Sequence, residues 1–159
     1  MTVEERPIVL EEGEGTTIQG PAGGPLTFKV RGAQTGGHLT AFENVVAPGD
    51  GPPLHTHARE GESWYVLEGS LRFKLDGDIR RAPAGSFVFV PPGIPHCFQN
   101  VGDAPARILV LFSPAGMEAF FDRFAELPPG PVDQSVFAAL GREVGMDVLG
   151  PPLAISDPL

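Results

Sequence analysis

The stretch from Gly49 to Gly69, GDGPPLHTHAREGESWYVLEG, brings two histidines and a carboxylate close together in the chain. Side chains at positions i and i+2 of an extended segment point to the same face, roughly 6.6 Å apart along the backbone at about 3.3 Å per residue. His55 and His57 can therefore reach one metal ion. Residues 58–61 (AREG) contain a glycine and predict a turn, so Glu62, at the start of the apolar run that follows, is expected beside the histidine pair.

A similar organisation is present in residues 85–100, GSFVFVPPGIPHCFQN, where an apolar strand leads through a Pro92-Gly93 turn to a further histidine. Together the two stretches supply four candidate metal ligands: His55, His57, Glu62 and His96. Three imidazoles and one carboxylate suit Mn, Fe, Co, Ni, Cu or Zn and leave one or two coordination positions open. We therefore predict one divalent transition metal ion, without a choice among these elements. The alternative is that the four residues are ordinary polar groups in a protein that has lost its ion.

Both stretches resemble the two sequence motifs of the cupin superfamily. The first motif (G, five residues, H-x-H, three or four residues, E, six residues, G) is matched by Gly49, His55, His57, Glu62 and Gly69. The second (G, five residues, P-x-G, two residues, H, three residues, N) is matched by Gly85, Pro91, Gly93, His96 and Asn100. A lone HxH would be weak, but ten positions in the right order are specific. The resemblance covers roughly residues 36–112, and the whole chain is more loosely similar to small quercetinase-like cupins with a helical tail.

The resemblance implies an antiparallel jelly-roll β-barrel, often paired into a homodimer. It also implies a function, because quercetinase-like cupins and many relatives activate oxygen or an enolisable substrate at such a metal. Glu62 is then the candidate catalytic residue, leaving the metal to act as general base in a dioxygenase-like reaction on a small aromatic or enolic molecule. Two alternatives stay open: a non-catalytic metal or small-ligand binding module, and an isomerase or lyase.

Length and charge limit the other possibilities. The 159 residues suit one domain, and 20 acidic against 11 basic residues give a net charge of −9, which disfavours nucleic acid and anionic membrane surfaces as partners. A single cysteine excludes an internal disulfide bond. The acidic start MTVEERPIVLEEGEG lacks signal-peptide features and no apolar run is long enough to cross a bilayer, so a cytoplasmic protein is expected.

Short apolar runs between turn signals predict an all-β domain. The expected strands are 26–30, 38–46, 64–67, 70–76 and 107–112. Residues 70–76 alternate most clearly, which predicts one buried face and one solvated face that includes Arg72. Gly69 and the sequence Asp76-Gly77-Asp78 predict hairpin turns with a residue at positive φ, and therefore antiparallel pairing. Residues 1–25 predict either an arm with one or two edge strands or a frayed terminus.

The periodicity becomes helical near the C-terminus. Ser113 and Pro114 read as the N-cap and first residue of one helix, and apolar residues every four positions predict a second over 132–144, with an extended tail at 146–159. The predicted organisation is a barrel with its N-terminal arm at 1–113 and helices with a tail packed on it at 114–159. The phenylalanines of the first helix either close a mouth of the barrel over a ligand or pack on the outside of the sheet.

Strand parity predicts which side chains line a pocket. The predicted substrate pocket consists of Phe42, Trp64, Phe73 and Phe98. Such a lining favours a flat or apolar ligand, or else it simply fills the barrel core. His38 is a possible fifth ligand or a half-exposed polar residue, and Cys97, next to His96 in the chain, is expected to point away from the metal.

Overall fold

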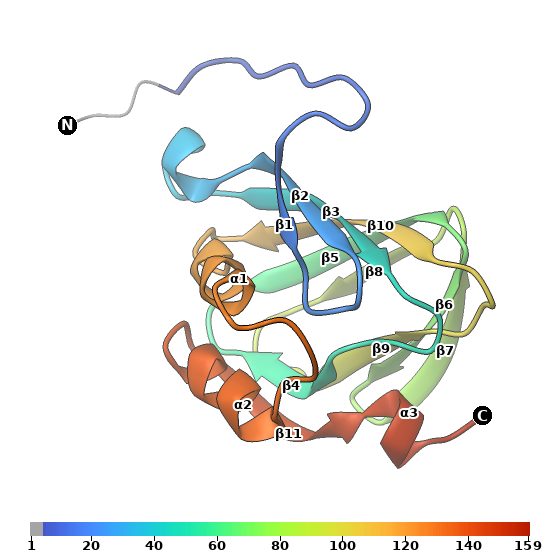
Figure 1. Cartoon of the computed structure of the whole chain (residues 1–159). Coiled ribbons are helices and arrows are strands. Elements are labelled where there is room, and N and C mark those ends of the chain that lie inside the picture. The colour runs from blue at the N-terminus through green and yellow to red at the C-terminus, as the bar shows by residue number, and fades with distance from the viewer. Residues whose placement is uncertain (1–4) are drawn as a thin grey trace.

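The computed structural model describes residues 5–159 as two antiparallel β-sheets that pack face to face (Figure 1). The six-stranded sheet has the order β1 (Thr16–Gln19), β2 (Pro25–Val30), β3 (Thr40–Val46), β10 (Ala106–Ser113), β5 (Gly61–Glu68) and β8 (Phe87–Val90). The five-stranded sheet has the order β11 (Met146–Pro152), β4 (Pro53–His57), β9 (His96–Asn100), β6 (Ser70–Leu75) and β7 (Asp78–Pro83). The helical segments are η1 (Gly32–Gln34), α1 (Glu118–Ala125), α2 (Gln134–Arg142) and α3 (Leu153–Ser156). The prediction of an antiparallel jelly-roll barrel with C-terminal helices is confirmed.

The core lies between the two sheets because their strands alternate buried and less buried residues. In β10, for example, Ala106, Ile108, Val110 and Phe112 are buried while the residues between them are only partly covered. Large side chains from both sheets fill the interior: Leu26, Phe42, Trp64, Leu71, Phe73, Ile108 and Phe112. Burying an aliphatic or aromatic side chain of this size contributes about 1.5–3 kcal/mol, so this layer supplies most of the driving force for packing the sheets.

The two predicted hairpins have different outcomes. Asp76 (φ 49°) and Gly77 (φ 93°) form the turn of a true hairpin between β6 and β7. Gly69 also has a positive φ, 87°, but it connects β5 in one sheet to β6 in the other, so the predicted hairpin there is wrong. A Cβ at Gly69 would lie 2.9 Å from the Cβ of Ala106, and this close approach as well as the positive φ requires glycine.

Helix α1 begins later than predicted. Ser113 is the last residue of β10 instead of an N-cap, and the helix starts at Glu118. The Glu118 carboxylate accepts hydrogen bonds from the backbone N–H of Gly32 (2.8 Å) and Gly116 (2.8 Å) and from the hydroxyl of Thr40. Burial favours the neutral form of Glu118, but these hydrogen bonds outweigh it and lower its pKa. These hydrogen bonds hold the start of α1 in place, and the helix lies at the open end between the two sheets (Figure 1).

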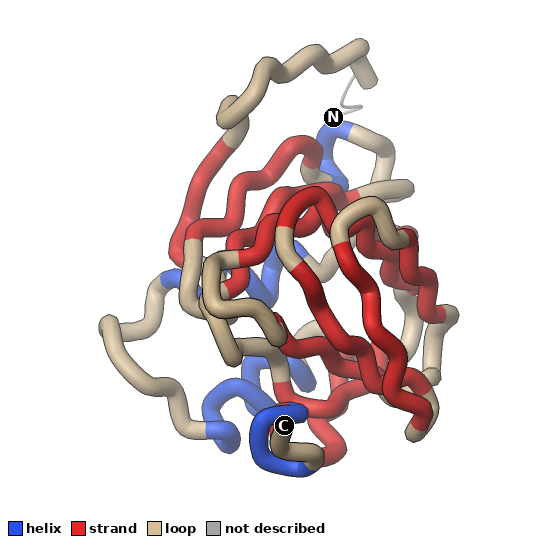
Figure 2. The backbone as a smooth tube through the Cα atoms, turned by 90° about the vertical axis from the view of Figure 1, so that its right-hand side faces the viewer, coloured by secondary structure: helices blue, strands red, loops and turns tan. Residues whose placement is uncertain are grey.

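The C-terminal segment adds a strand to the five-stranded sheet. The expected extended tail forms β11, which pairs with β4 in a register that sets Met146 opposite His57. The chain then turns into α3, the helical turn beside the C-terminus at the front of Figure 2. Residues near this helix cover Arg72, which donates to the side chain of Gln99 (2.8 Å) and to the carbonyl of Asp157. Arg72, predicted to be solvated, is therefore buried, because a segment 85 residues away in the chain covers it.

The N-terminal segment supplies one edge strand. β1 pairs with β2 of the same chain, with Thr16 opposite Phe28, and residues 1–4 of the predicted arm lie outside the described part. None of the helices among residues 5–159 has the length and apolar character needed to span a bilayer.

Candidate metal centre

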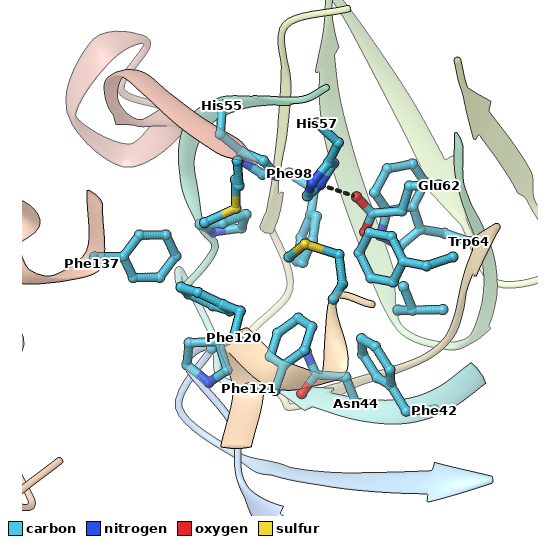
Figure 3. Close-up of a pocket in the computed structure, with 17 residues that line it drawn as sticks. Phe42, Asn44, His55, His57, Glu62, Trp64, Phe98, Phe120, Phe121 and Phe137 are labelled. Atoms are coloured by element: carbon cyan, nitrogen blue, oxygen red, sulfur yellow. Dashed lines mark hydrogen bonds and ion pairs between the residues drawn. The ribbon is translucent and has the colours of Figure 1, made fainter. Parts of the chain in front are cut away.

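The structure brings the four predicted ligands together inside the barrel. His55, His57 and Glu62 are labelled in Figure 3. Two histidines come from β4, the third opens β9, and the carboxylate comes from β5 of the opposite sheet. One ligand atom from each of these four buried residues lies within 4.8 Å of the others: His55, His57, Glu62 and His96. The cluster therefore connects the two sheets.

Local strand geometry explains this convergence. β4 alternates buried and partly buried positions, so both of its histidines face the interior, as the i, i+2 spacing predicts. In the ladder between β4 and β9, His55 lies directly opposite His96, and their ring centroids are 4.4 Å apart. Glu62 approaches from β5, where its Oε1 lies 3.0 Å from Nε2 of His57 and 3.1 Å from Nε2 of His96.

Backbone carbonyl groups orient two of the three imidazoles. Nδ1–H of His55 donates to the carbonyl of Pro53 (2.7 Å), and Nδ1–H of His96 donates to that of Ile94 (2.8 Å). Both rings therefore direct Nε2 into the cluster, the arrangement that metal-binding histidines use. Nδ1 of His57 is buried and has no hydrogen-bond partner among residues 5–159.

The electrostatics of the cluster favour a bound cation. Burial, followed by the charges of the other two imidazoles, lowers the pKa of His55 to about 3, so this ring is neutral and able to coordinate. Burial also favours the neutral form of Glu62, but hydrogen bonds from His57 and His96 outweigh it and lower the pKa of the carboxyl to about 2. The pKa of His96 is lowered by burial but raised overall by Glu62, so a proton and a metal ion compete for its Nε2. Three imidazoles and an ionised carboxylate in a buried site fit a divalent transition metal.

An apolar cavity of about 50 Å³ adjoins the cluster. Of the predicted pocket residues, Phe42, Trp64 and Phe98 line it. Phe73 does not: it lies behind them, with its ring centroid 5.2 Å from that of Trp64 and 5.6 Å from that of Phe98. The alternation of side chains along the strand correctly predicts that Phe73 points into the interior. Which of the interior aromatic rings faces the cavity depends on how neighbouring rings pack.

The C-terminal helices supply lining residues that strand parity could not identify. These are Met117, Phe120 and Phe121 from the α1 region and Phe137 from α2 (Figure 3). Phe120 and Phe121 of α1 therefore close one side of the cavity, as in the first of the two alternatives for the phenylalanines of this helix, while Phe124 does not line it. A larger surface groove of about 860 Å³ adjoins the cavity and shares Pro21, Pro52 and Phe137 with it. Asn44 also lines the cavity but was not among the predicted pocket residues. Its position on the inward face of the predicted strand 38–46 could have identified it.

His38 and Cys97 lie away from the cluster. His38 is exposed in the loop before β3 and is not among the clustered ligands. Cys97 is fully buried and pairs in register with Lys74, near α3 on the outer side of the five-stranded sheet. Strand parity therefore separates Cys97 from its neighbour His96, as predicted.

Cys97 is expected to be chemically inert in the folded protein. Burial raises the pKa of its thiol to about 11, so the group stays protonated until the pH approaches that value. Iodoacetamide at pH 8 should label the native protein far more slowly than the unfolded protein, and Cys97→Ala should keep both metal content and any activity. Rapid native labelling, or activity lost while the metal is retained, would show that the thiol takes part in the chemistry.

Comparison with known proteins finds a family model that matches the middle of the chain. Residues 42–112 match the family model described as a cupin domain. This region is a cupin domain. A cupin from Shewanella frigidimarina NCIMB 400, described as RmlC-like, superimposes with a TM-score of 0.58 at 26% identity, covering 72% of this chain and 97% of that one.

Sequence relatives of the cupin domain differ in their described activities. Mannose-1-phosphate guanylyltransferase from Escherichia coli (strain K12) is 29% identical over 88 residues, which cover 52% of this chain and 18% of that protein. Quercetin 2,3-dioxygenase from Bacillus subtilis (strain 168) is 31% identical over 99 residues, which cover 60% of this chain and 28% of that protein. The chain thus spans less than a third of either relative. Similarity of residues 42–112 to the cupin domain model therefore does not by itself specify a reaction.

Proposed function

We propose that this protein is a metal-dependent enzyme, dioxygenase-like in its chemistry, that acts on a small aromatic or enolic molecule. The observation that supports this function is a cluster of three histidines and one glutamate, within 4.8 Å of one another, at the side of an aromatic-lined cavity. The partial similarity to quercetin 2,3-dioxygenase from Bacillus subtilis (strain 168) agrees with it.

The imidazoles and the carboxylate would hold one divalent transition metal ion. Such an ion supplies a Lewis acid that polarises a coordinated oxygen atom and, when redox-active, an electron donor toward oxygen. The carbonyl contacts of His55 and His96 hold their rings in place for this task, so little reorganisation is needed on binding.

Glu62 would act on the substrate proton. Its low pKa keeps the carboxylate ionised at neutral pH, and its position between His57 and His96 sets it next to any group that reaches the ligand cluster. An enolic or phenolic hydroxyl that reaches the cluster would transfer its proton to Oε1 or Oε2 of Glu62, and a bound metal ion would supply the positive charge that makes this hydroxyl more acidic.

The cavity would select the substrate by size and exclude water. Its volume of about 50 Å³ has room for only a few water molecules, at roughly 10–15 Å³ each, and lies far below the roughly 300–1,000 Å³ of pockets for drug-sized ligands. Benzene binds in a cavity of about 150 Å³, so even a single-ring phenol, a catechol or a short diketone requires lining side chains to move aside. A larger flavonol requires a lining side chain such as Phe137 to move.

An oxygen electrode tests the proposed function directly. Protein loaded separately with Fe, Mn, Co, Ni, Cu and Zn is offered catechols, phenols, diketones and flavonols, and oxygen uptake is measured together with product. We expect uptake with at least one redox-active metal and none with Zn. Tight binding without turnover for every metal would favour a binding module, and product formed without oxygen would favour an isomerase or lyase.

We also propose that the protein forms a homodimer. β1 pairs with β2 of its own chain, so it does not need a partner chain. Support for a dimer comes from the opposite edge of the six-stranded sheet. An apolar patch on its outer face consists of Tyr65 (43% exposed), Phe87 (64%) and Phe89 (57%). Aromatic patches of this kind on an edge strand mark protein interfaces.

Light scattering at micromolar concentration should give the mass of a dimer. The double variant Phe87→Glu/Phe89→Glu should shift it to a monomer, because two charges would be buried without partners in the interface. Ile155→Glu, at a residue that is 69% exposed on α3, is the matched control and should remain dimeric. A monomer mass for the wild type would refute the proposal.

A further inference from the structure

The cavity beside the histidine cluster is too small for an organic ligand as it stands. Its volume is about 50 Å³, whereas a cavity that binds benzene measures about 150 Å³. The adjoining groove, at about 860 Å³, falls within the roughly 300–1,000 Å³ of pockets that hold small organic molecules. A ligand with one end at the cluster must therefore enlarge the cavity, and the groove is the neighbouring space that can hold its other end.

The wall between the two spaces contains one side chain that can turn aside. The residues that line both are Pro21, Pro52 and Phe137. The proline rings are closed onto the backbone, so they have no side-chain rotamer to change. Phenylalanine in a helix takes χ1 near 180° or near −60° without a change in the backbone. Phe137 is therefore the part of the shared wall that a rotamer change can move.

The neighbouring rings of the same wall are held more firmly than that of Phe137. Phe120 and Phe121 are only 2% and 9% exposed, and they belong to α1, whose start is fixed by the hydrogen bonds of Glu118. Phe137 is half-buried on α2, where its ring centroid lies 5.0 Å from that of Phe120 and 6.0 Å from that of Phe124. Figure 3 shows Phe137 on the opposite side of the pocket from Glu62. Displacing its ring therefore opens the cavity at the side away from the carboxylate.

The groove is apolar and carries little charge. Among the described residues that line it, Asp50 is the charged one, and its carboxylate accepts a hydrogen bond from the N–H of Gly51 (2.8 Å). An anion in the groove would meet this carboxylate without a cation to pair with, whereas an uncharged molecule would not be repelled. Rigid proline rings supply apolar surface that loses little conformational entropy on binding. These prolines are Pro21, Pro52, Pro53, Pro128, Pro129, Pro131 and Pro152.

We propose that the cavity and the groove form one ligand site, and that Phe137 is the specificity-determining residue at their junction, where its ring turns aside to admit the ligand. The ligand class is an uncharged molecule of two or three rings. One ring occupies the cavity together with the space that Phe137 vacates, and the remainder lies in the groove. Phosphorylated and other anionic molecules are excluded. This inference rests on the proposed function only for the group that reaches the metal cluster.

Acrylamide quenching of Trp64 fluorescence tests the junction without any ligand. Trp64, the only tryptophan in the chain, lines the cavity and is 1% exposed. A minor open conformation is populated at about 10% or less, so Phe137→Ala, which keeps the junction open, should raise the quenching constant of the Zn-loaded protein about tenfold. Val136→Ala is the matched control and should equal the wild type, because Val136 is 40% exposed on the same helix and lines neither space.

A second variant keeps this test valid if the alanine substitution disturbs α2. Phe137→Leu retains an apolar side chain and should give a quenching constant between those of wild type and Phe137→Ala, at a melting temperature close to that of the wild type. Quenching equal to wild type in both Phe137 variants would overturn the inference. A wild-type quenching constant that falls as protein concentration rises would show that a second copy covers the groove, and it would also overturn the inference.

Two phenols of similar length test the ligand class. Zn-loaded wild type is titrated by calorimetry with 4-phenylphenol and with 4′-hydroxybiphenyl-4-sulfonate, a poor metal ligand whose charge would lie in the groove. The uncharged compound should bind about tenfold more tightly, because the sulfonate is repelled by Asp50. Asp50→Asn keeps an oxygen acceptor for the N–H of Gly51 and should reduce this difference. Equal or tighter binding of the sulfonate, or no binding of either compound, would overturn the inference.

The oxygen measurement keeps the two proposals distinguishable. Binding of 4-phenylphenol with quenching that depends on Phe137, but without oxygen uptake for any metal, would reject the dioxygenase and keep the extended ligand site. Oxygen uptake with quenching unaffected in both Phe137 variants would reject the extended ligand site alone.

Discussion

Protein purified with His57→Ala is expected to contain less than a tenth of the divalent metal of the wild type after identical dialysis. The substitution removes one of four ligand atoms that lie within 4.8 Å of one another. Loss of the hydrogen bonds behind metal ligands alone weakens affinity 10–100-fold, so loss of a ligand itself should weaken it by about 100-fold or more. Elemental analysis of protein made without a histidine tag measures the content.

His38→Ala is the matched control for this result. His38 is exposed and lies outside the ligand cluster, so its removal should leave the metal content at the wild-type value. The melting temperature of both variants should be recorded with excess metal, because the buried His57 also contacts Phe112, at a ring distance of 5.1 Å. Equal metal content in wild type and His57→Ala would exclude the proposed centre.

Glu62→Gln should lower kcat by about 10²–10⁴-fold, the usual contribution of a positioned general base, while retaining part of the metal. The amide keeps the size of the side chain and one oxygen ligand, but it cannot accept the substrate proton. Substrate affinity should change much less, whereas Trp64→Ala should mainly weaken binding, since it removes a ring that lines the cavity.

Glu68→Gln serves as the control for the loss of a carboxylate from the same strand. Glu68 is exposed at the end of β5, where it pairs with Arg107 at 3.5 Å, and its substitution should leave kcat unchanged. Metal content has to be measured for each variant, so that turnover is expressed per bound ion. A kcat for Glu62→Gln equal to that of the wild type would assign the proton transfer to another group.

Short-range geometry made the cluster of candidate metal ligands predictable from sequence. The i, i+2 spacing of His55 and His57 requires only that β4 is extended, and its buried positions alternate as expected. The same parity separated His96 from Cys97 and set Trp64 on the face of Glu62. Each of these conclusions depends on the direction of successive side chains along one strand.

The predictions from sequence that are wrong concern residues whose structure depends on segments far away in the chain. Gly69 has the positive φ that a hairpin turn needs, but a glycine corner between sheets has the same local conformation, so only pairing distinguishes them. Ser113 and Pro114 carry a helix-start signal, but pairing with β5 extends β10 through Ser113. Arg72 lies on the polar face of an alternating strand, which predicts exposure to solvent, but the C-terminal segment covers it.

The sequence by itself therefore determined the antiparallel all-β domain, the four residues of the candidate metal cluster and the inward face of each strand, because backbone geometry repeats every two residues regardless of context. Only the tertiary structure decided which sheet each strand joins, that α1 and α2 close the cavity, and that Phe73 lies behind its lining. It also left Oδ1 of Asn44 without a partner. These features depend on which residues, far apart in the chain, pack against one another. Such packing follows no regular repeat along the sequence, whereas the alternation of side chains along a strand does.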